Sequence, residues 1–410
     1  MELLYVILVL LTVTRLFGEV AERLKQPALV GELVSGLALG VIAHHFSSTL
    51  PVLANLSTDK VFIAVTDLSI FFLMLLAGIE LHPREIAGAA KSAAAVALGG
   101  MLLPLIAGVL LGWWFLPVSE YRLPQALFVA MALSITAVPV SVRVLMDLDK
   151  LKSPLGKTIV SAAVFDDIAS LVLLAVLTAV IKTGGFPKGE TFFWLFGKLI
   201  LFFIITTLVG RYLYPYIGKI IKKFYAQEFE FSGLLIAALA YSMLAETLGI
   251  HFILGAFLGG LFFVRRTIAP KVYTNVREKL ITCTSGLFAP LFFASIGMHL
   301  DISAATQIPV FTVLLVIVAF LGKLIGSGLP AYWSGFSARD SVAIGTGMSA
   351  RGAVELIIAD IALRAGLFNQ PQPVPEIVRH LFSAVVIVAI VTTIITPIVL
   401  KTILKTSDGQ

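Results

Sequence analysis

The feature that most constrains this chain is a series of apolar stretches, each about 20 residues long, that recurs from one end to the other. About 20 apolar residues in a helix cross the hydrocarbon core of a bilayer, and the backbone polar groups of such a segment are satisfied within the helix. Only 13% of the 410 residues are charged, against about 25% in soluble domains. The sequence therefore predicts an all-α polytopic membrane protein.

Thirteen membrane spans can be placed along the chain. They cover residues 2–18, 27–44, 60–80, 90–115, 124–146, 156–181, 191–216, 229–247, 250–265, 281–299, 308–332, 341–365 and 378–403. Assigning successive loops to alternate sides puts 20 basic residues on one side and 6 on the other. By the positive-inside rule the richer side is cytoplasmic. This predicts an external N-terminus and a cytoplasmic C-terminus in a prokaryotic plasma (inner) membrane.

The basic residues also argue against a nucleic-acid partner. The net charge is +6, but the lysines and arginines lie in short clusters between apolar stretches, as in the loops of membrane proteins. The N-terminal segment lacks the basic region and small-residue cleavage site of a signal peptide. We expect it to be a retained first helix.

Two short stretches occur twice, in the same order and at nearly the same separation. VGELVSGL (30–37) matches LGAFLGGL (254–261), and GIEL (78–81) matches GMHL (297–300). Spans 1 to 6 would then repeat as spans 8 to 13, with span 7 as a linker, so that the second copy enters the membrane from the opposite side. Two inverted six-helix repeats are typical of transporters, in which the substrate site lies between the repeats near the midplane.

Spans 5 and 12 contain residues that interrupt helices. Pro139 in the middle of span 5 removes a backbone donor, and Thr136 and Ser141 beside it supply hydroxyl oxygens. In span 12 three glycines surround Arg351. Discontinuous helices at corresponding places in two repeats predict a binding site. A simple proline kink that packing tolerates is the alternative.

Asp166 and Asp167 stand side by side within span 6. An ionised group at the bilayer centre costs at least ~2.5 kcal/mol, so such acids mark ion or proton routes. Neighbours on a helix point about 100° apart, so one acid can meet Lys323, which has no acid in its own span, while the other faces a cavity. Carboxylate, hydroxyl and carbonyl oxygens suit a hard cation. Cation and proton would compete for the cavity-facing acid, which amounts to antiport.

The remaining charges inside spans have structural interpretations. Arg351 and Glu355 are i,i+4 neighbours, and we expect them to form an ion pair that keeps the interrupted helix in shape. Four other acids are expected to face the bundle interior or an interface: Glu32, Asp67, Glu246 and Asp360.

Four motifs together resemble the bacterial monovalent cation:proton antiporter-2 family, the sodium/hydrogen exchanger domain of the sodium:proton antiporter fold. They are PALVGEL near the start, FDDIASL, GKLIG and RGAVEL, and the resemblance covers essentially the whole chain. It implies two crossed discontinuous helices, a mobile core domain, a panel domain that forms a homodimer, and elevator-like alternating access. It also implies that Asp167 binds sodium, that Asp166 pairs with Lys323, and that Thr136 lies in the first crossed helix.

The resemblance also predicts a domain division. The panel would comprise residues 1–81 and 228–300, the core residues 87–182 and 305–405, and a linker helix residues 190–224. No cofactor and no enzymatic activity are expected. The substrates would be Na⁺ (or Li⁺ or K⁺) and H⁺, and the partners membrane lipid and a second copy of the chain.

Several alternatives stay open. One is a potassium/proton antiporter of the same architecture. Many potassium-efflux relatives carry Gln or Asn in place of the first acid and continue into a nucleotide-binding domain, whereas this chain has Asp166 and ends at Gln410. A sodium-coupled organic-solute symporter is a second alternative. An intramembrane aspartyl protease is a third, but its two acids must share a proton, and neighbours on one helix point apart.

The charges at the site predict electrogenic exchange. With two carboxylates and one ammonium, Asp167 and Lys323 can both give up protons when one cation binds, so that two protons exchange for one cation. If Lys323 stays charged and only holds Asp166 in place, the cycle is one-for-one and neutral.

Overall fold

The structure is a computed structural model that describes residues 2–46, 51–54, 56, 59–80, 90–183, 189–213, 228–263 and 270–405. All regular elements in these residues are helices. In chain order they are α1 (Glu2–Arg23), α2 (Ala28–His45), α3 (Pro51–Ala54), α4 (Lys60–Glu80), α5 (Ala90–Phe115), α6 (Arg122–Ser134), α7 (Val138–Asp147), α8 (Pro154–Thr183), α9 (Gly189–Leu208), the π-helical turn η2 (Val209–Leu213), α11 (Phe229–Thr247), α12 (Phe252–Leu261), α13 (Pro270–Cys283), the π-helical turn η3 (Thr284–Phe288), α14 (Ala289–Met298), α15 (Ala304–Gln307), α16 (Pro309–Trp333), α17 (Ala338–Gly347), α18 (Ala353–Arg364), the 3₁₀ turn η4 (Leu367–Asn369), α19 (Glu376–Arg379) and α20 (Leu381–Lys405).

Within the described residues, eight helical segments are long and apolar enough to cross a membrane. They are Leu3–Arg23, Lys60–Glu80, Lys91–Phe115, Pro154–Ile181, Phe229–Thr247, Pro270–Met298, Pro309–Trp333 and Leu381–Leu404. Two shorter apolar helices cover Ala28–Ala43 and Phe252–Leu261. All of these overlap predicted spans. Their length does not establish the count of thirteen, partly because spans 5 and 12 are each divided into two short helices.

One predicted boundary is wrong. Span 10 was placed at residues 281–299, whereas the helical segment begins at Pro270 and continues through the π-helical turn η3 to Met298. Its first turns carry Lys271, Arg277 and Lys279, so they escape a search for apolar residues. The end of the predicted linker helix, residues 214–224, lies outside the described residues.

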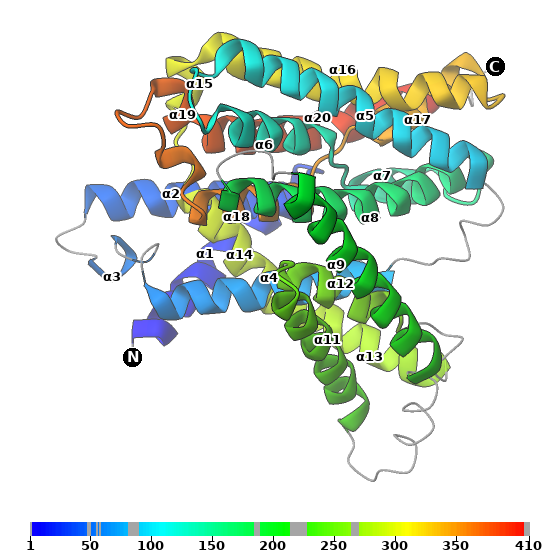
Figure 1. The fold of residues 1–410 in the computed structure, drawn as a ribbon, viewed down its shortest axis with the longest axis horizontal. Helices are drawn as coiled ribbons and strands as arrows, with labels where there is room; N and C mark the ends of the chain where they lie inside the picture. Colours follow the sequence, from blue (N-terminus) through cyan, green and yellow to red (C-terminus); the bar gives the residue numbers. More distant parts are fainter. Residues whose placement is uncertain are drawn as a thin grey trace. The chain divides into compact units, whose positions relative to one another are not determined.

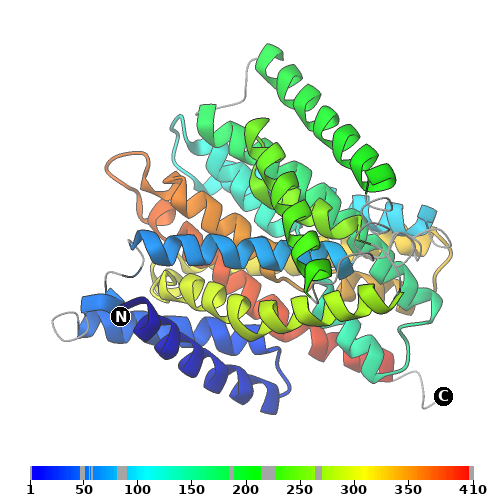
Figure 2. The same ribbon diagram turned by 90° about the horizontal axis from the view of Figure 1, so that it is seen from below.

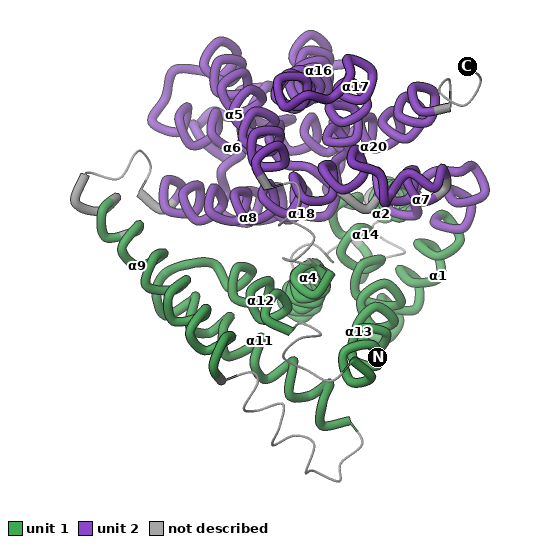
Figure 3. Tube along the Cα trace, turned by 90° about the vertical axis from the view of Figure 1, so that its right-hand side faces the viewer, with its two compact units in different colours: residues 1–17, 32–82, 187–298 green, residues 18–31, 83–186, 299–410 purple. Residues whose placement is uncertain are grey.

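The chain forms two compact units, each assembled from segments far apart in the sequence (Figure 3). Unit 1 comprises residues 1–17, 32–82 and 187–298. Unit 2 comprises residues 18–31, 83–186 and 299–410.

In unit 1 the repeated stretches make reciprocal contacts. A Cβ on Gly297 of α14 would lie 2.9 Å from the Cα of Gly36 on α2, and a Cβ on Gly260 of α12 would lie 3.1 Å from the carbonyl carbon of Gly78 on α4. Gly36 and Gly260 hold the same place in one repeated stretch, and Gly78 and Gly297 hold the same place in the other. Each contact is thus the counterpart of the other, which is the pattern that a two-fold relation between repeats produces. Figure 2 shows α4 in blue alongside the yellow-green segment α13–α14.

In unit 2 the helices α5 and α16 run side by side (Figure 1). They approach closely because glycines face each other, and a Cβ on Gly99 would lie only 2.2 Å from the carbonyl oxygen of Gly326. The helix α8 packs against α5 and α6, and α16 also packs against α17 and α20. These contacts place α8 and α16, the helices that carry the predicted site, within one packed unit.

Candidate functional site

Both predicted interruptions are present in unit 2. The first lies between α6 and α7, where Ile135 and Ala137 have extended backbone. The second lies between α17 and α18, at residues 348–352. The first break precedes Pro139, which lies in the first turn of α7, so span 5 is interrupted rather than kinked at the proline. A proline disfavours helix in the residue before it but is accepted at a helix start.

Hydrogen bonds join the two breaks. The amide of Ala137 donates to the carbonyl of Ala350 at 2.7 Å, and the hydroxyl of Ser141 donates to the carbonyl of Gly347 at 2.5 Å. A Cβ on Gly352 would lie 2.5 Å from the Cβ of Ala137, so glycine is required at that position. The hydroxyl of Ser141 is therefore already used between the breaks.

Arg351 lies in the second break and is fully buried. Its terminal nitrogens donate at 2.5 to 3.2 Å to four backbone carbonyls, those of Ala132, Leu133, Ile135 and Ala319. Two of these carbonyls lie in the last turn of α6 and a third belongs to Ile135, the residue directly after it. At this end a helix leaves acceptors without intrahelical donors and carries partial negative charge. The guanidinium thus caps the end of the first half-helix.

The expected ion pair between Arg351 and Glu355 is present. It does not lie on one helix face, because Arg351 precedes α18, which begins at Ala353. The Nε of Arg351 lies 3.9 Å from the Oε2 of Glu355, beyond hydrogen-bonding distance. The hydrogen-bond partners of Arg351 are carbonyls at the end of α6 and in α16.

The structure brings Asp166 and Lys323 together. The Nζ of Lys323 lies 3.0 Å and 3.2 Å from the two carboxylate oxygens of Asp166, and both side chains are completely buried. Asp167 is half-buried, and among the described residues its carboxylate makes no hydrogen bond or ion pair. It interacts electrostatically with Asp166 and Lys323. One acid of the pair is therefore held by the lysine, and the other is not.

Two hydroxyl groups of unit 2 are buried without a hydrogen-bond partner in the described chain. The hydroxyl of Thr136 in the first break is buried and has no hydrogen-bond partner within the described chain. It is not in hydrogen-bond contact with Asp167, although α6 and α8 pack against each other. The hydroxyl of Ser170, one turn after Asp167, is also buried without a described partner, whereas Thr206 donates to the carbonyl four residues back. Sequence reasoning missed Ser170, and its i,i+3 spacing from Asp167 was the available signal.

Most of the other acids inside spans have assigned partners. Glu32 lies 3.8 Å from Arg15, and Asp360 lies 2.7 Å from Arg364. The carboxylate of Glu246 accepts a hydrogen bond from the amide of Phe252. In the described residues no group of three or more His, Cys, Asp or Glu side chains is arranged to hold a metal ion.

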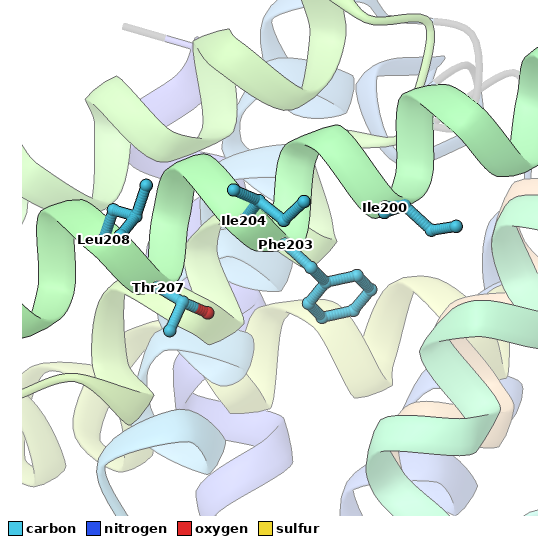
Figure 4. Close-up of a pocket in the computed structure, with 5 residues that line it drawn as sticks. All are labelled: Ile200, Phe203, Ile204, Thr207 and Leu208. Carbon is cyan, nitrogen blue, oxygen red and sulfur yellow. The ribbon is translucent and has the colours of Figure 1, made fainter.

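Unit 1 contains a hollow whose lining residues are not among the predicted site residues. It has a volume of about 410 Å³ and is lined by Ile200, Phe203, Ile204, Thr207 and Leu208 of α9 (Figure 4). Its lining contains one hydroxyl and no carboxylate, so it does not suit a cation.

Comparisons with known proteins agree on one family. The family model for the sodium/hydrogen exchanger, transmembrane, matches residues 7–406. The Na⁺/H⁺-K⁺ antiporter GerN of Bacillus cereus is 33% identical over 390 residues, which is 95% of this chain and 93% of GerN. The probable Na⁺/H⁺ antiporter GerT of the same organism is 32% identical over 382 residues, 93% of this chain and 94% of GerT.

A solved structure has the same fold. The sodium proton antiporter MjNhaP1 from Methanocaldococcus jannaschii at pH 8 superposes with a TM-score of 0.65, with 16% identity, over 98% of this chain and 96% of that one. The family match and the bacterial relatives make this protein a multi-pass membrane transporter rather than an enzyme. The chain belongs to the sodium/hydrogen exchanger family, whose members exchange cations for protons across a membrane.

Proposed function

We propose that the protein exchanges sodium or lithium for protons and that cation and proton occupy Asp167 in turn. The observation that carries the proposal is the contrast between the two adjacent acids. Asp166 is bound to Lys323 through both oxygens, whereas Asp167 is half-buried and has no hydrogen-bond or ion-pair partner in the described chain. A carboxylate without a fixed partner is free to exchange one cation for another.

Oxygen ligands for a cation are available close to the break between α6 and α7. Thr136 offers a buried hydroxyl without a described partner, and interrupted helices expose carbonyl groups that coordinate Na⁺ in other transporters. Carboxylate, hydroxyl and carbonyl oxygens together suit a hard monovalent cation. We assign Asp167 and Thr136 as sodium ligands, with Asp166 supporting them.

Lys323 is the charge partner through which protons and cation are coupled. It neutralises Asp166 and adds positive charge beside Asp167. Exchange is electrogenic in this proposal, with more than one proton moved per cation.

The moving part in this proposal is unit 2, which contains both breaks and the Asp166–Lys323 pair. The two breaks form a crossing point, and unit 2 acts as the core domain of an elevator-like cycle. Unit 1 acts as the panel that forms a homodimer. The reciprocal glycine contacts in unit 1 support the inverted repeat on which such cycles depend.

Potassium is the second candidate cation, because one relative is called a Na⁺/H⁺-K⁺ antiporter. The test is proton flux from purified proteoliposomes that contain a pH-sensitive dye, after separate addition of Na⁺, Li⁺ or K⁺. We expect Na⁺ and Li⁺ to collapse the proton gradient, and Asp167→Asn to abolish the response in protein that remains folded. Near-normal flux in that variant would refute the assignment of Asp167 as the cation site. A response to K⁺ alone would identify potassium as the transported cation.

The orientation is part of the proposal. The partition of basic residues places the C-terminus in the cytoplasm and the N-terminus outside. Ser407, which lies outside the described residues, offers a test by Ser407→Cys in a chain with Cys283 replaced. The new thiol should resist membrane-impermeant reagents in intact cells and react after lysis. Labelling from outside would overturn the topology.

A further inference from the structure

The hollow along α9 is a feature of unit 1 that the proposed transport cycle does not use. Its volume of about 410 Å³ falls within the range of roughly 300 to 1,000 Å³ that small-molecule sites occupy. Thr207 is the only polar residue in its lining, and Ile200, Ile204 and Leu208 are each exposed by half or more (Figure 4). An exposed apolar hollow of this kind marks a binding surface for an apolar partner.

The hollow lies along a helix that the sequence places inside the membrane. α9 falls within predicted span 7, residues 191–216. Its other side packs into unit 1, where Thr206 is fully buried and its carbonyl accepts a hydrogen bond from the hydroxyl of Tyr241 on α11. From Ile200 to Leu208 the helix rises by about 12 Å, which is most of the ~15 Å depth of one hydrocarbon leaflet. The hollow thus extends over a length that an acyl chain of that leaflet would cover.

A lysine lies at the N-terminal end of the hollow. Lys198 is exposed, and in the described residues its side chain has no ion pair or hydrogen bond. Helical side chains point toward the N-terminus of their helix, so the ammonium of Lys198 is directed toward the turn that carries the exposed Trp194. Tryptophan and lysine at one level are typical of the boundary between hydrocarbon and headgroups.

The unpaired ammonium decides which apolar partner suits this surface. No acid lies within one helical turn of Lys198 on α9, so the charge calls for an anion supplied from outside the helix. A second copy of the chain would cover the hollow with protein, but the cores of protein interfaces are depleted of lysine, because an uncompensated charge is costly to bury. A molecule with an anionic end and an apolar chain meets both requirements.

We propose that α9 carries a binding site for an anionic phospholipid, with the phosphate at Lys198 and one acyl chain in the hollow between Ile200 and Leu208. The lipid belongs to the leaflet that contains the N-terminal end of α9, and the ring of Trp194 lies at the level of its headgroup. The proposed cation ligands all belong to unit 2, so the lipid site is distinct from the cation site and the inference does not rest on the proposed function.

Native mass spectrometry of the purified protein, in detergent with added dioleoylphosphatidylglycerol or dioleoylphosphatidylcholine, counts bound lipids and measures their affinities. We expect the wild type to bind phosphatidylglycerol in preference to phosphatidylcholine. Lys198→Gln should weaken phosphatidylglycerol binding by about fivefold and leave phosphatidylcholine binding unchanged, because only the charge is lost. Ile204→Trp should weaken the binding of both lipids, because the larger side chain fills the hollow.

Lys60→Gln is the matched control. Lys60 is exposed at the start of α4 in unit 1, and predicted spans 3 and 7 begin on the same side of the membrane. The variant therefore loses the same charge on the same side without altering the hollow, and it should bind both lipids as the wild type does. Equal losses in Lys60→Gln and Lys198→Gln would show attraction by net charge alone and would overturn the site. Unchanged binding in Lys198→Gln or Ile204→Trp would overturn it as well.

A second copy of the chain is the competing occupant and has its own outcome. If Ile204→Trp converts a dimer into monomers in lipid-free detergent while phosphatidylglycerol binding is retained, the hollow is a protein interface and the lipid proposal fails. Thermal unfolding gives a second readout, because a lipid that binds the folded protein raises the melting midpoint. Phosphatidylglycerol should raise the midpoint of the wild type more than that of Lys198→Gln, and equal rises would contradict the site. None of these measurements depends on cation flux.

Discussion

Replacing Asp166 by Asn removes the charge that compensates Lys323 but keeps nearly the same side-chain volume. At the 3.0 Å separation of the pair, two unit charges attract each other by about 5 kcal/mol at an effective dielectric constant of about 20. Removing one partner of a buried pair typically costs about 3 to 5 kcal/mol, because the other charge stays buried. We therefore expect Asp166→Asn to destabilise the fold by about that amount.

Thermal unfolding in detergent at neutral pH, followed at one scan rate, measures the effect. About 2 °C per kcal/mol is the scale for a chain of more than 200 residues, so the apparent midpoint should fall by roughly 6 to 10 °C. The double variant Asp166→Asn with Lys323→Met should recover at least half of the loss, since neutral replacements of similar size remove the uncompensated charge.

The control is an exposed ion pair on α1. Arg23 and Glu19 lie 2.8 Å apart with 78% and 58% of their side chains exposed, and such pairs contribute at most about 1 kcal/mol. Arg23→Gln should shift the midpoint by no more than about 2 °C. The reasoning fails if Asp166→Asn behaves like this control, or if the double variant is no more stable than Asp166→Asn.

Three further predictions concern voltage, packing and pH. If exchange is electrogenic, a membrane potential imposed on proteoliposomes, negative on the side that protons enter, should accelerate the initial rate of exchange. Each net charge that crosses the membrane couples to the potential by ~2.3 kcal/mol per 100 mV. No response of the rate, together with a stoichiometry of one proton per cation, would contradict electrogenic exchange. Gly352→Ala should separate the two breaks and lower the stability of the fold by about 1 to 3 kcal/mol through overpacking. Gly197→Ala is the control, because nothing lies within 4 Å of the added Cβ, and it should be neutral or stabilising in the same melting assay. Burial raises the pKa of Asp301, but hydrogen bonds from Ser303 and the charge of His380 outweigh it and leave the pKa below 3.8. The stability that Asp301 contributes is therefore present above about pH 4 and lost as the pH falls through the lower folded-state value. Since 56% of this side chain is exposed, Asp301→Asn should cost no more than about 1 kcal/mol at pH 7, and melting curves that differ more at pH 3 than at pH 7 would contradict the sign.

The sequence alone determined the membrane class, the positions of most helices and the two candidate interruptions. These features follow from local composition, since a run of about 20 apolar residues has few alternatives to a spanning helix. A contact between Lys323 and one of the two adjacent acids was also predictable, because Lys323 has no acid in its own span and needs a counter-ion among few deep acids. Hydropathy failed where polar turns extend an apolar helix, as at the start of α13.

Tertiary structure decided the partners of the remaining polar groups. The sequence spacing of Arg351 and Glu355 predicted their ion pair but not the hydrogen bonds of the guanidinium. Three of its four carbonyl partners lie more than 200 residues away in the sequence. Likewise the breaks face each other only because Gly352 lacks a side chain where Ala137 approaches. Which of two adjacent acids meets Lys323, and which buried carboxylate is left without hydrogen bonds, depends on how separate helices rotate and pack. A sequence pattern records which groups need partners, but packing between distant segments determines which of them obtain one.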